Sequence, residues 1–226
     1  MRWTRLTLEL DDISGTMGIM IITYFGKQFI KVQLGDTVLA INPIAKNSKL
    51  KSSRFGADIA MVSLNHPDFN GIEQVTNGSK EPFVISGPGE YEINGIPIRG
   101  FSTESQYEKE QKINTIYTVE LENTVLCFLG SLHSSDLADK IMGEIGGIDI
   151  LFTPIGGGDV LTPNEAHKLA TKLEASVIIP LDSQESLLKD FLKESGEEKI
   201  VPIDKLTIKR KDIEGKDGEI VVLKSL

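Results

Sequence analysis

Residues 57–71 constrain the fold of this chain most, because an apolar run there leads directly into a polar turn. Residues 59–62 are unbroken, apolar and largely branched, which is typical of a strand buried on both faces. His66, Pro67 and Asp68 follow in the turn. Because open α/β proteins usually build their sites where such strands end, we expect a candidate site in this loop.

Strands are predicted along the whole chain, and helices only in its second half. The Asn94-Gly95 dipeptide predicts a hairpin, and residues 162–165 form a capping box that predicts a helix start. Residues 103–112 are charged and are expected to form an exposed loop. The predicted strands are residues 19–25, 28–34, 37–41, 57–64, 82–86, 91–98 (as the hairpin), 113–121, 125–129, 148–153 and 176–181, with 206–211 and 219–223 pairing as a closing hairpin. The predicted helices begin at Ser134 or Ser135, at Thr162 and near Leu187.

Meanders of strands therefore come first, and alternation of strands and helices comes later. This order predicts one α/β (α+β) domain over residues 17–226, in which helices cover a strand-rich core. Residues 1–16 are predicted to be an N-terminal extension, either disordered or an edge strand.

Charge and composition exclude several classes of partner. The chain has a formal net charge of -9 and no basic cluster, which argues against nucleic acid and anionic membranes as partners. No stretch approaches the roughly 18 apolar residues of a membrane span, and we find no signal peptide. The single cysteine, Cys127, is expected to be a small buried hydrophobe. These features together predict a cytoplasmic protein.

Several short motifs, in the order of the predicted elements, resemble the metallo-β-lactamase fold. They are most similar to motifs of small zinc-dependent hydrolases of the ascorbate-6-phosphate lactonase type. The resemblance implies a four-layer αββα sandwich. The motifs are Ile-Asn-Pro at 41–43, Ala-Asp-Ile at 57–59, Pro-Gly-Glu-Tyr-Glu at 88–92, Asp-Ile-Leu and Pro-x-Gly-Gly within 149–157, and Ile-Ile-Pro at 178–180.

The metal-binding loop implied by this resemblance is only partly present. The family has a His-x-His-x-Asp-His loop, which aligns with residues 64–69. Its first histidine is Leu64 here and its last is Phe69, so that only His66 and Asp68 remain. Leucine and phenylalanine donate no lone pairs to a metal ion.

The other ligand positions of the family are changed as well. A further histidine would fall near Ser105, the bridging aspartate is Ser131, and the terminal histidine is Asp182. Catalytic zinc needs about three protein ligands and an open position for water. We therefore expect no cofactor in this protein, although the resemblance implies that the related hydrolases bind zinc. Weak Mg²⁺ or Mn²⁺ binding by His66, Asp68 and Asp182 stays open.

The remaining candidates each have a simpler interpretation, which we favour. His66 and Asp68 suit a turn stabilised by side-chain to backbone hydrogen bonds. Asp182 suits a helix N-terminus. His133 and His167 are expected to face solvent.

Glycine and serine residues near the predicted strand ends carry little chemistry. Residues 156–158, Gly-Gly-Gly, suit close packing better than an anion cradle. Ser131 and Ser134 have no base and orienting acid at a spacing that would activate a nucleophile.

Three functions follow from the sequence. The first is a relative of zinc-dependent hydrolases that has lost its metal site and binds a small ligand or a protein partner. The second is an active hydrolase of esters, lactones or phosphoesters that uses the reduced set His66, Asp68 and Asp182. The third is a structural or oligomeric module, and a homo-oligomer is compatible with all three.

Overall fold

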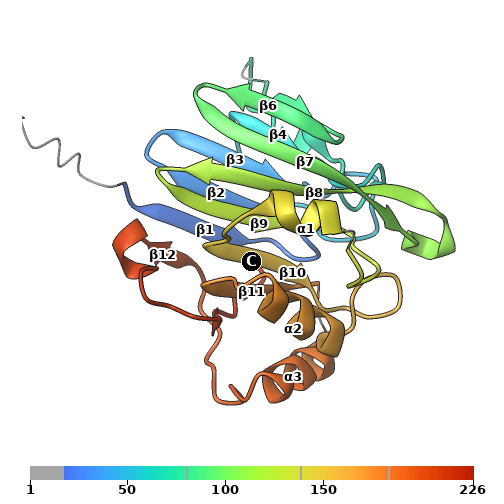
Figure 1. The fold of residues 1–226 in the computed structure, drawn as a ribbon. Helices are drawn as coiled ribbons and strands as arrows, with labels where there is room; N and C mark the ends of the chain where they lie inside the picture. Colours follow the sequence, from blue (N-terminus) through green and yellow to red (C-terminus); the bar gives the residue numbers. More distant parts are fainter. Residues whose placement is uncertain (1–17, 80, 138, 183) are drawn as a thin grey trace, which may run out of the picture.

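Two mixed β-sheets face each other in the computed structural model, which describes residues 18–79, 81–137, 139–182 and 184–226 (Figure 1). The predicted fold class is confirmed, since the two sheets face each other and helices pack on the outside of the second. The predicted extension, residues 1–16, lies outside the described residues. A single domain over residues 17–226 stays a prediction.

The first sheet has the strand order β12-β1-β2-β3-β4-β5. Strands β1, β2 and β3 form an antiparallel meander, and β4 and β5 then add in parallel to β3. Gly35 has a φ of +56° in the β2–β3 turn, a conformation that glycine adopts without a steric penalty. The strands are β1 Met20–Tyr24, β2 Ile30–Leu34, β3 Thr37–Ile41, β4 Ile59–Met61, β5 Phe83–Ile85 and β12 Leu206–Ile208.

The second sheet has the order β13-β11-β10-β9-β8-β7-β6. Strands β6 to β9 are antiparallel, whereas β9, β10, β11 and β13 run parallel, so their C-terminal ends meet at one edge. The strands are β6 Gly89–Ile93, β7 Ile96–Ser105, β8 Lys112–Leu121, β9 Thr124–Phe128, β10 Ile150–Pro154, β11 Val177–Leu181 and β13 Glu219–Ile220.

The helices that cover this second sheet are α1 Asp139–Ile145, α2 Pro163–Lys172 and α3 Glu185–Glu194 (Figure 1). The predicted capping box is present at α2: Thr162 Oγ1 accepts the Glu165 N–H, and Glu165 Oε2 accepts the Thr162 N–H. The outer face of the first sheet is covered by the segment between β3 and β5, which carries the 3-10 turn η1 Ile72–Gln74.

Apolar side chains fill the space between the layers. The central core joins both sheets and includes Ile22, Leu39, Tyr117 and Phe152, all fully or almost fully buried. A second core lies between the second sheet and the helices. Burying each large apolar side chain contributes about 1.5–3 kcal/mol, so these cores position the loops at the strand ends firmly.

Three expectations from the sequence are wrong. The C-terminal strands do not pair with each other, because β12 pairs with β1 in the first sheet and β13 with β11 in the second. Residues 103–112 are not a wholly exposed loop, since β7 continues to Ser105 and Tyr107 is buried. His167 does not face solvent fully, because its ring packs against Phe191 with the centroids 6.3 Å apart.

Candidate functional site

The loops after β4, β9, β10 and β11 meet the β7–β8 connection at one side of the molecule, and a cleft opens there beside the loops after β10 and β11. Two contacts tie the loop after β4 to the second sheet: Thr115 N–H donates to Ser63 O, and the Tyr107 hydroxyl donates to Asp68. The candidate residues of the sequence analysis therefore come from separate parts of the chain to one side of the molecule.

The two changed histidine positions of the loop form an apolar plug. Leu64 is 1% exposed and Phe69 is fully buried, and both pack against Tyr107 in a cluster of their own. The Phe69 and Tyr107 rings meet edge to face with centroids 5.1 Å apart. This plug fills the part of the loop in which the family places metal-ligating histidines.

The two retained residues are engaged in hydrogen bonds within the protein. Asp68 Oδ1 accepts the Ser48 hydroxyl at 2.5 Å, and Asp68 Oδ2 accepts the Tyr107 hydroxyl at 2.6 Å. His66 Nδ1 accepts the Asp68 N–H at 3.2 Å, which leaves the ring proton on Nε2, 3.2 Å from Glu108 Oε2. Burial raises the pKa of Tyr107, and its bond to Asp68 raises it further, so the hydroxyl stays a donor.

The two serine positions are buried next to this cluster. The hydroxyls of Ser105 and Ser131 lie 3.0 Å apart and share a hydrogen bond, and Ser105 Oγ also accepts the Tyr107 N–H at 3.3 Å. Asn114 Oδ1 accepts the Ser131 N–H at 2.7 Å. Two hydroxyls thus stand where the resemblance places a histidine and a bridging aspartate.

Asp182 enters the cleft from the end of β11, and Lys27 reaches it from the β1–β2 turn. Lys27 Nζ lies 2.7 Å from Asp182 Oδ2, and both side chains are less than one fifth exposed. The same ammonium lies 4.9 Å from the centroid of the Tyr107 ring. Burial raises the pKa of the Asp182 carboxyl, an effect that Lys27 partly offsets.

Two cavities share this pair: one of about 560 Å³ reaches toward Leu223 in the C-terminal segment, and one of about 390 Å³ opens toward the glycine loop after β10. Besides Lys27 and Asp182 the cavity of about 390 Å³ is lined by Tyr107, Asp159, Gln184 and the glycines of residues 156–158. Gly156 is needed for this shape, because a Cβ there would stand 2.5 Å from Asp182 O. The Glu108 N–H donates to Asp159 Oδ2 and ties the β7–β8 connection to the rim.

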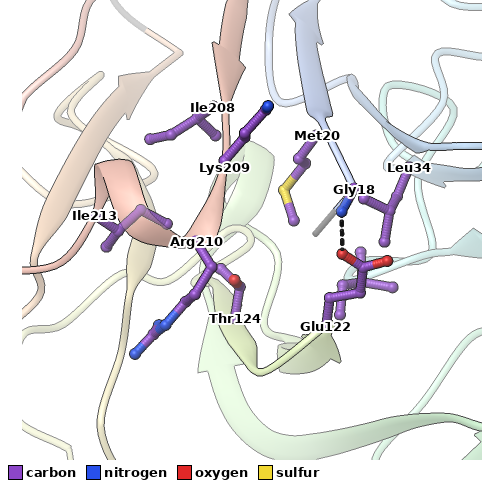
Figure 2. A pocket seen from close by; sticks show the side chains of 10 residues that line it. Gly18, Met20, Leu34, Glu122, Thr124, Ile208, Lys209, Arg210 and Ile213 are labelled. Atoms are coloured by element: carbon purple, nitrogen blue, oxygen red, sulfur yellow. Dashed lines mark hydrogen bonds between the residues drawn. The ribbon is translucent and has the colours of Figure 1, made fainter. Parts of the chain in front are cut away.

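A much smaller cavity lies at the opposite end of β9, between β1, β12 and the β8–β9 turn (Figure 2). There the Gly18 N–H donates to Glu122 Oε2 at 2.6 Å, and the volume is only about 10 Å³. Such a space holds about one water molecule and no larger ligand.

The residues that contact the candidates most closely are Tyr107, Lys27 and Ser48, and none of them is predicted from the sequence. Tyr107 was signalled only by being the one aromatic side chain within the charged residues 103–112. Lys27 and Ser48 carried no signal, since each lies far along the chain from its partner. His133 is half-buried and lines a different cavity, so it stays apart from this site.

The chain is similar in sequence to a known protein family and to several bacterial proteins. Residues 21–182 match the profile of a family described as the beta-lactamase superfamily domain. A Bacillus thuringiensis protein named UPF0173 metal-dependent hydrolase is 25% identical over 193 residues, which cover 72% of this chain and 85% of the relative. A Listeria monocytogenes protein of the same name is 24% identical over 196 residues, covering 72% and 84%.

Two crystal structures extend the comparison. One, from Thermotoga maritima, is described as a Zn-dependent hydrolase of the metallo-beta-lactamase superfamily; its TM-score is 0.72 at 27% identity, covering 90% of this chain and 98% of that one. The other, the metallo-beta-lactamase fold protein YhfI from Bacillus subtilis, has a TM-score of 0.58 at 12% identity. The match covers 92% of this chain and 97% of that one, and it supports the fold alone.

These names overturn one expectation. We expected no cofactor, and this expectation is wrong. The relatives are named metal-dependent hydrolases, and the Thermotoga protein is described as Zn-dependent, so the names of the relatives imply a metal cofactor. The donor set of this chain does not fit that ion: among the described residues, no group of three or more His, Cys, Asp or Glu side chains is placed to hold one. In the described part of the chain, no helix has both the length and the apolar character that crossing a membrane requires.

Proposed function

The chain belongs to the metallo-β-lactamase superfamily, and on that premise we propose that its cleft acts by binding a small polar ligand. The observation that carries this proposal is the state of Asp68, whose two carboxylate oxygens each accept a hydroxyl of the protein itself. With Leu64 and Phe69 buried beside it, this end of the cleft is closed to a ligand. Of the two cavities that Lys27 and Asp182 share, we take the one of about 390 Å³, because it also reaches Tyr107 and the glycine loop after β10.

The lining of that cavity decides which ligands suit it. Lys27 and Asp182 neutralise each other, and Asp159 adds a further carboxylate, so the formal charge of the lining is negative. A phosphate or carboxylate ligand would meet these carboxylates without a compensating charge. Tyr107, Gln184 and the glycine backbone offer an aromatic face and polar groups. The ligand we propose is therefore a small polar molecule that is neutral or carries one positive charge.

Calorimetry with two sets of small molecules tests this proposal. One set is neutral or singly cationic, such as amides, polyols and amines, and the other is anionic, such as acetate and inorganic phosphate. Members of the first set should bind, and Asp159→Asn should weaken the cationic ones, while Asp190→Asn on the exposed face of α3 should not. Preferential binding of the anions would contradict the proposal.

A second candidate function is metal-dependent hydrolysis, and the names of the relatives favour it. His66 Nδ1 lies 3.6 Å from Asp68 Oδ2, and Asp182 lines the neighbouring cavity with Tyr107, whose hydroxyl donates to Asp68. Under this candidate, the protein hydrolyses p-nitrophenyl acetate or bis-p-nitrophenyl phosphate when metal is supplied, and His66→Ala removes the activity. A rate no higher than that of the heat-denatured protein, with Zn²⁺ or Mn²⁺ present, leaves the binding function as the better account.

A further inference from the structure

The strongest feature outside the retained metal motif is the pair formed by Lys27 and Asp182. We infer that the Lys27 ammonium takes the place of a bound cation in this cleft, so that a divalent ion reaches Asp182 only by displacing it. The inference does not depend on whether the cleft binds its ligand or hydrolyses it.

The surroundings of Lys27 Nζ are those of a bound cation. The nitrogen lies 2.7 Å from Asp182 Oδ2, 4.9 Å from the Tyr107 ring centroid and 5.9 Å from that of Phe69. Aromatic faces and a carboxylate both stabilise an ammonium, and more strongly where water is largely excluded. The Lys27 side chain is 17% exposed and that of Asp182 is 14% exposed. Because little water reaches the pair, each charge is stabilised mainly by the other.

The backbone on both sides is shaped to bring the pair together. Lys27 and Asp182 both have positive φ, at +51° and +55°, a conformation uncommon for residues other than glycine. The buried Tyr24 hydroxyl joins them, because it donates to Lys27 O at 2.9 Å and accepts the Asp182 N–H at 3.1 Å. Such strain persists only where the surrounding structure fixes it, so this is a built arrangement.

The place of the pair is the reason to connect it with a metal. Asp182 stands where the sequence resemblance puts the terminal ligand, and the plug of Leu64, Phe69 and Tyr107 borders the same ammonium. Removing the amine would leave Asp182 buried with no opposite charge beside it. A buried carboxylate in that state demands another cation or a proton.

The test uses the full chain with Lys27→Met, which keeps the length of the apolar stem. We expect its melting temperature to fall by about 5–10 °C, since breaking a buried pair strands a charge. Millimolar Mn²⁺ or Mg²⁺ should restore part of this loss and should leave the wild type unchanged. Lys205→Met, at an exposed position, is the matched control.

A second variant keeps the test decisive if Lys27→Met folds poorly. The double variant Lys27→Met with Asp182→Asn removes both charges, so it should be more stable than Lys27→Met alone and should not respond to metal. Three results overturn the inference: Lys27→Met is as stable as the wild type, both respond equally to metal, or Lys27→Met responds to no ion. The last would make the pair an ordinary buried ion pair. None of these results bears on the charge preference of the ligand, which the calorimetry tests separately.

Discussion

Asp68 illustrates how single residues decide the chemistry of this cleft. Its carboxylate survives from the metal motif of the family, yet Ser48 and Tyr107 use both of its oxygens. The apolar character of Leu64 and Phe69 was visible in the sequence, and so was the loss of their donor function. The engagement of Asp68 was not, because Ser48 and Tyr107 lie 20 and 39 residues away from it along the chain.

Restoring the two histidines by Leu64→His and Phe69→His should destabilise the protein. Each imidazole would replace a buried apolar side chain at a position that offers no hydrogen-bond partner. We expect each substitution to lower the free energy of unfolding by about 2–5 kcal/mol. Urea unfolding without added metal measures this cost. Leu64→Met is the matched control and should cost less than about 1.5 kcal/mol, because it conserves volume. A double variant as stable as the wild type would show that the plug is loosely packed.

Cys127 should be chemically inert in the folded protein. Burial raises the pKa of its thiol to about 12, and the side chain is fully inaccessible in the second core. Since the thiolate is the reactive form, a thiol-specific reagent should label the native protein far more slowly than the protein in denaturant. Cys127 is the only cysteine, so the signal is unambiguous. Rapid labelling of native protein would mean that β9 opens frequently.

The positions of individual helices, turns and strands could be predicted from the sequence better than the pairing between strands. The capping box of α2, the Asn94-Gly95 turn and most strand positions follow from local chemistry, which the sequence displays directly. The pairing of β12 and β13 does not, because glycines at 215 and 218 between two apolar runs suggest a hairpin. The structure instead inserts the 3-10 turn η3 Arg210–Asp212 and sends the two strands to different sheets.

Removing the cap of α2 by Thr162→Ala should cost about 1 kcal/mol of stability at neutral pH. The bond to the Thr162 side chain lowers the pKa of Glu165 below its ordinary value, and a bond to the Thr162 backbone N–H adds to this. A lowered folded-state pKa stabilises the protein above the unfolded-state pKa of about 4.3, and this contribution is lost as pH falls through the lower value.

The variant should therefore lose less stability than the wild type between about pH 6 and pH 3. Urea midpoints across this range test the difference. Thr171→Ala, whose hydroxyl donates to His167 O within the same helix, is the control and should leave the acid dependence unchanged. An equal acid response of Thr162→Ala and wild type would show that Glu165 keeps its low pKa without the Thr162 hydroxyl.

At the scale of the whole molecule, the C-terminal segment ties the two sheets together. Strand β12 extends the first sheet and β13 the second, and between them Arg210 pairs with Asp149 at the start of β10. Ile213, 2% exposed, packs into the core that both sheets share. The cleft depends on this union, since Lys27 lies in the β1–β2 turn of the first sheet and Asp182 directly follows β11 of the second.

Ile213→Ala should consequently weaken both sheets together. Truncating a buried isoleucine costs about 2–5 kcal/mol, and a shared core distributes that loss over every element that unfolds with it. Hydrogen exchange followed by mass spectrometry should show equal losses of protection in β1 and in β11, although β11 lies in the other sheet. Val201→Ala, which truncates a side chain that is 78% exposed, should change neither. Loss confined to one sheet would mean that the sheets unfold separately, and the Lys27–Asp182 pair would then have to hold the cleft together without a common core beneath it.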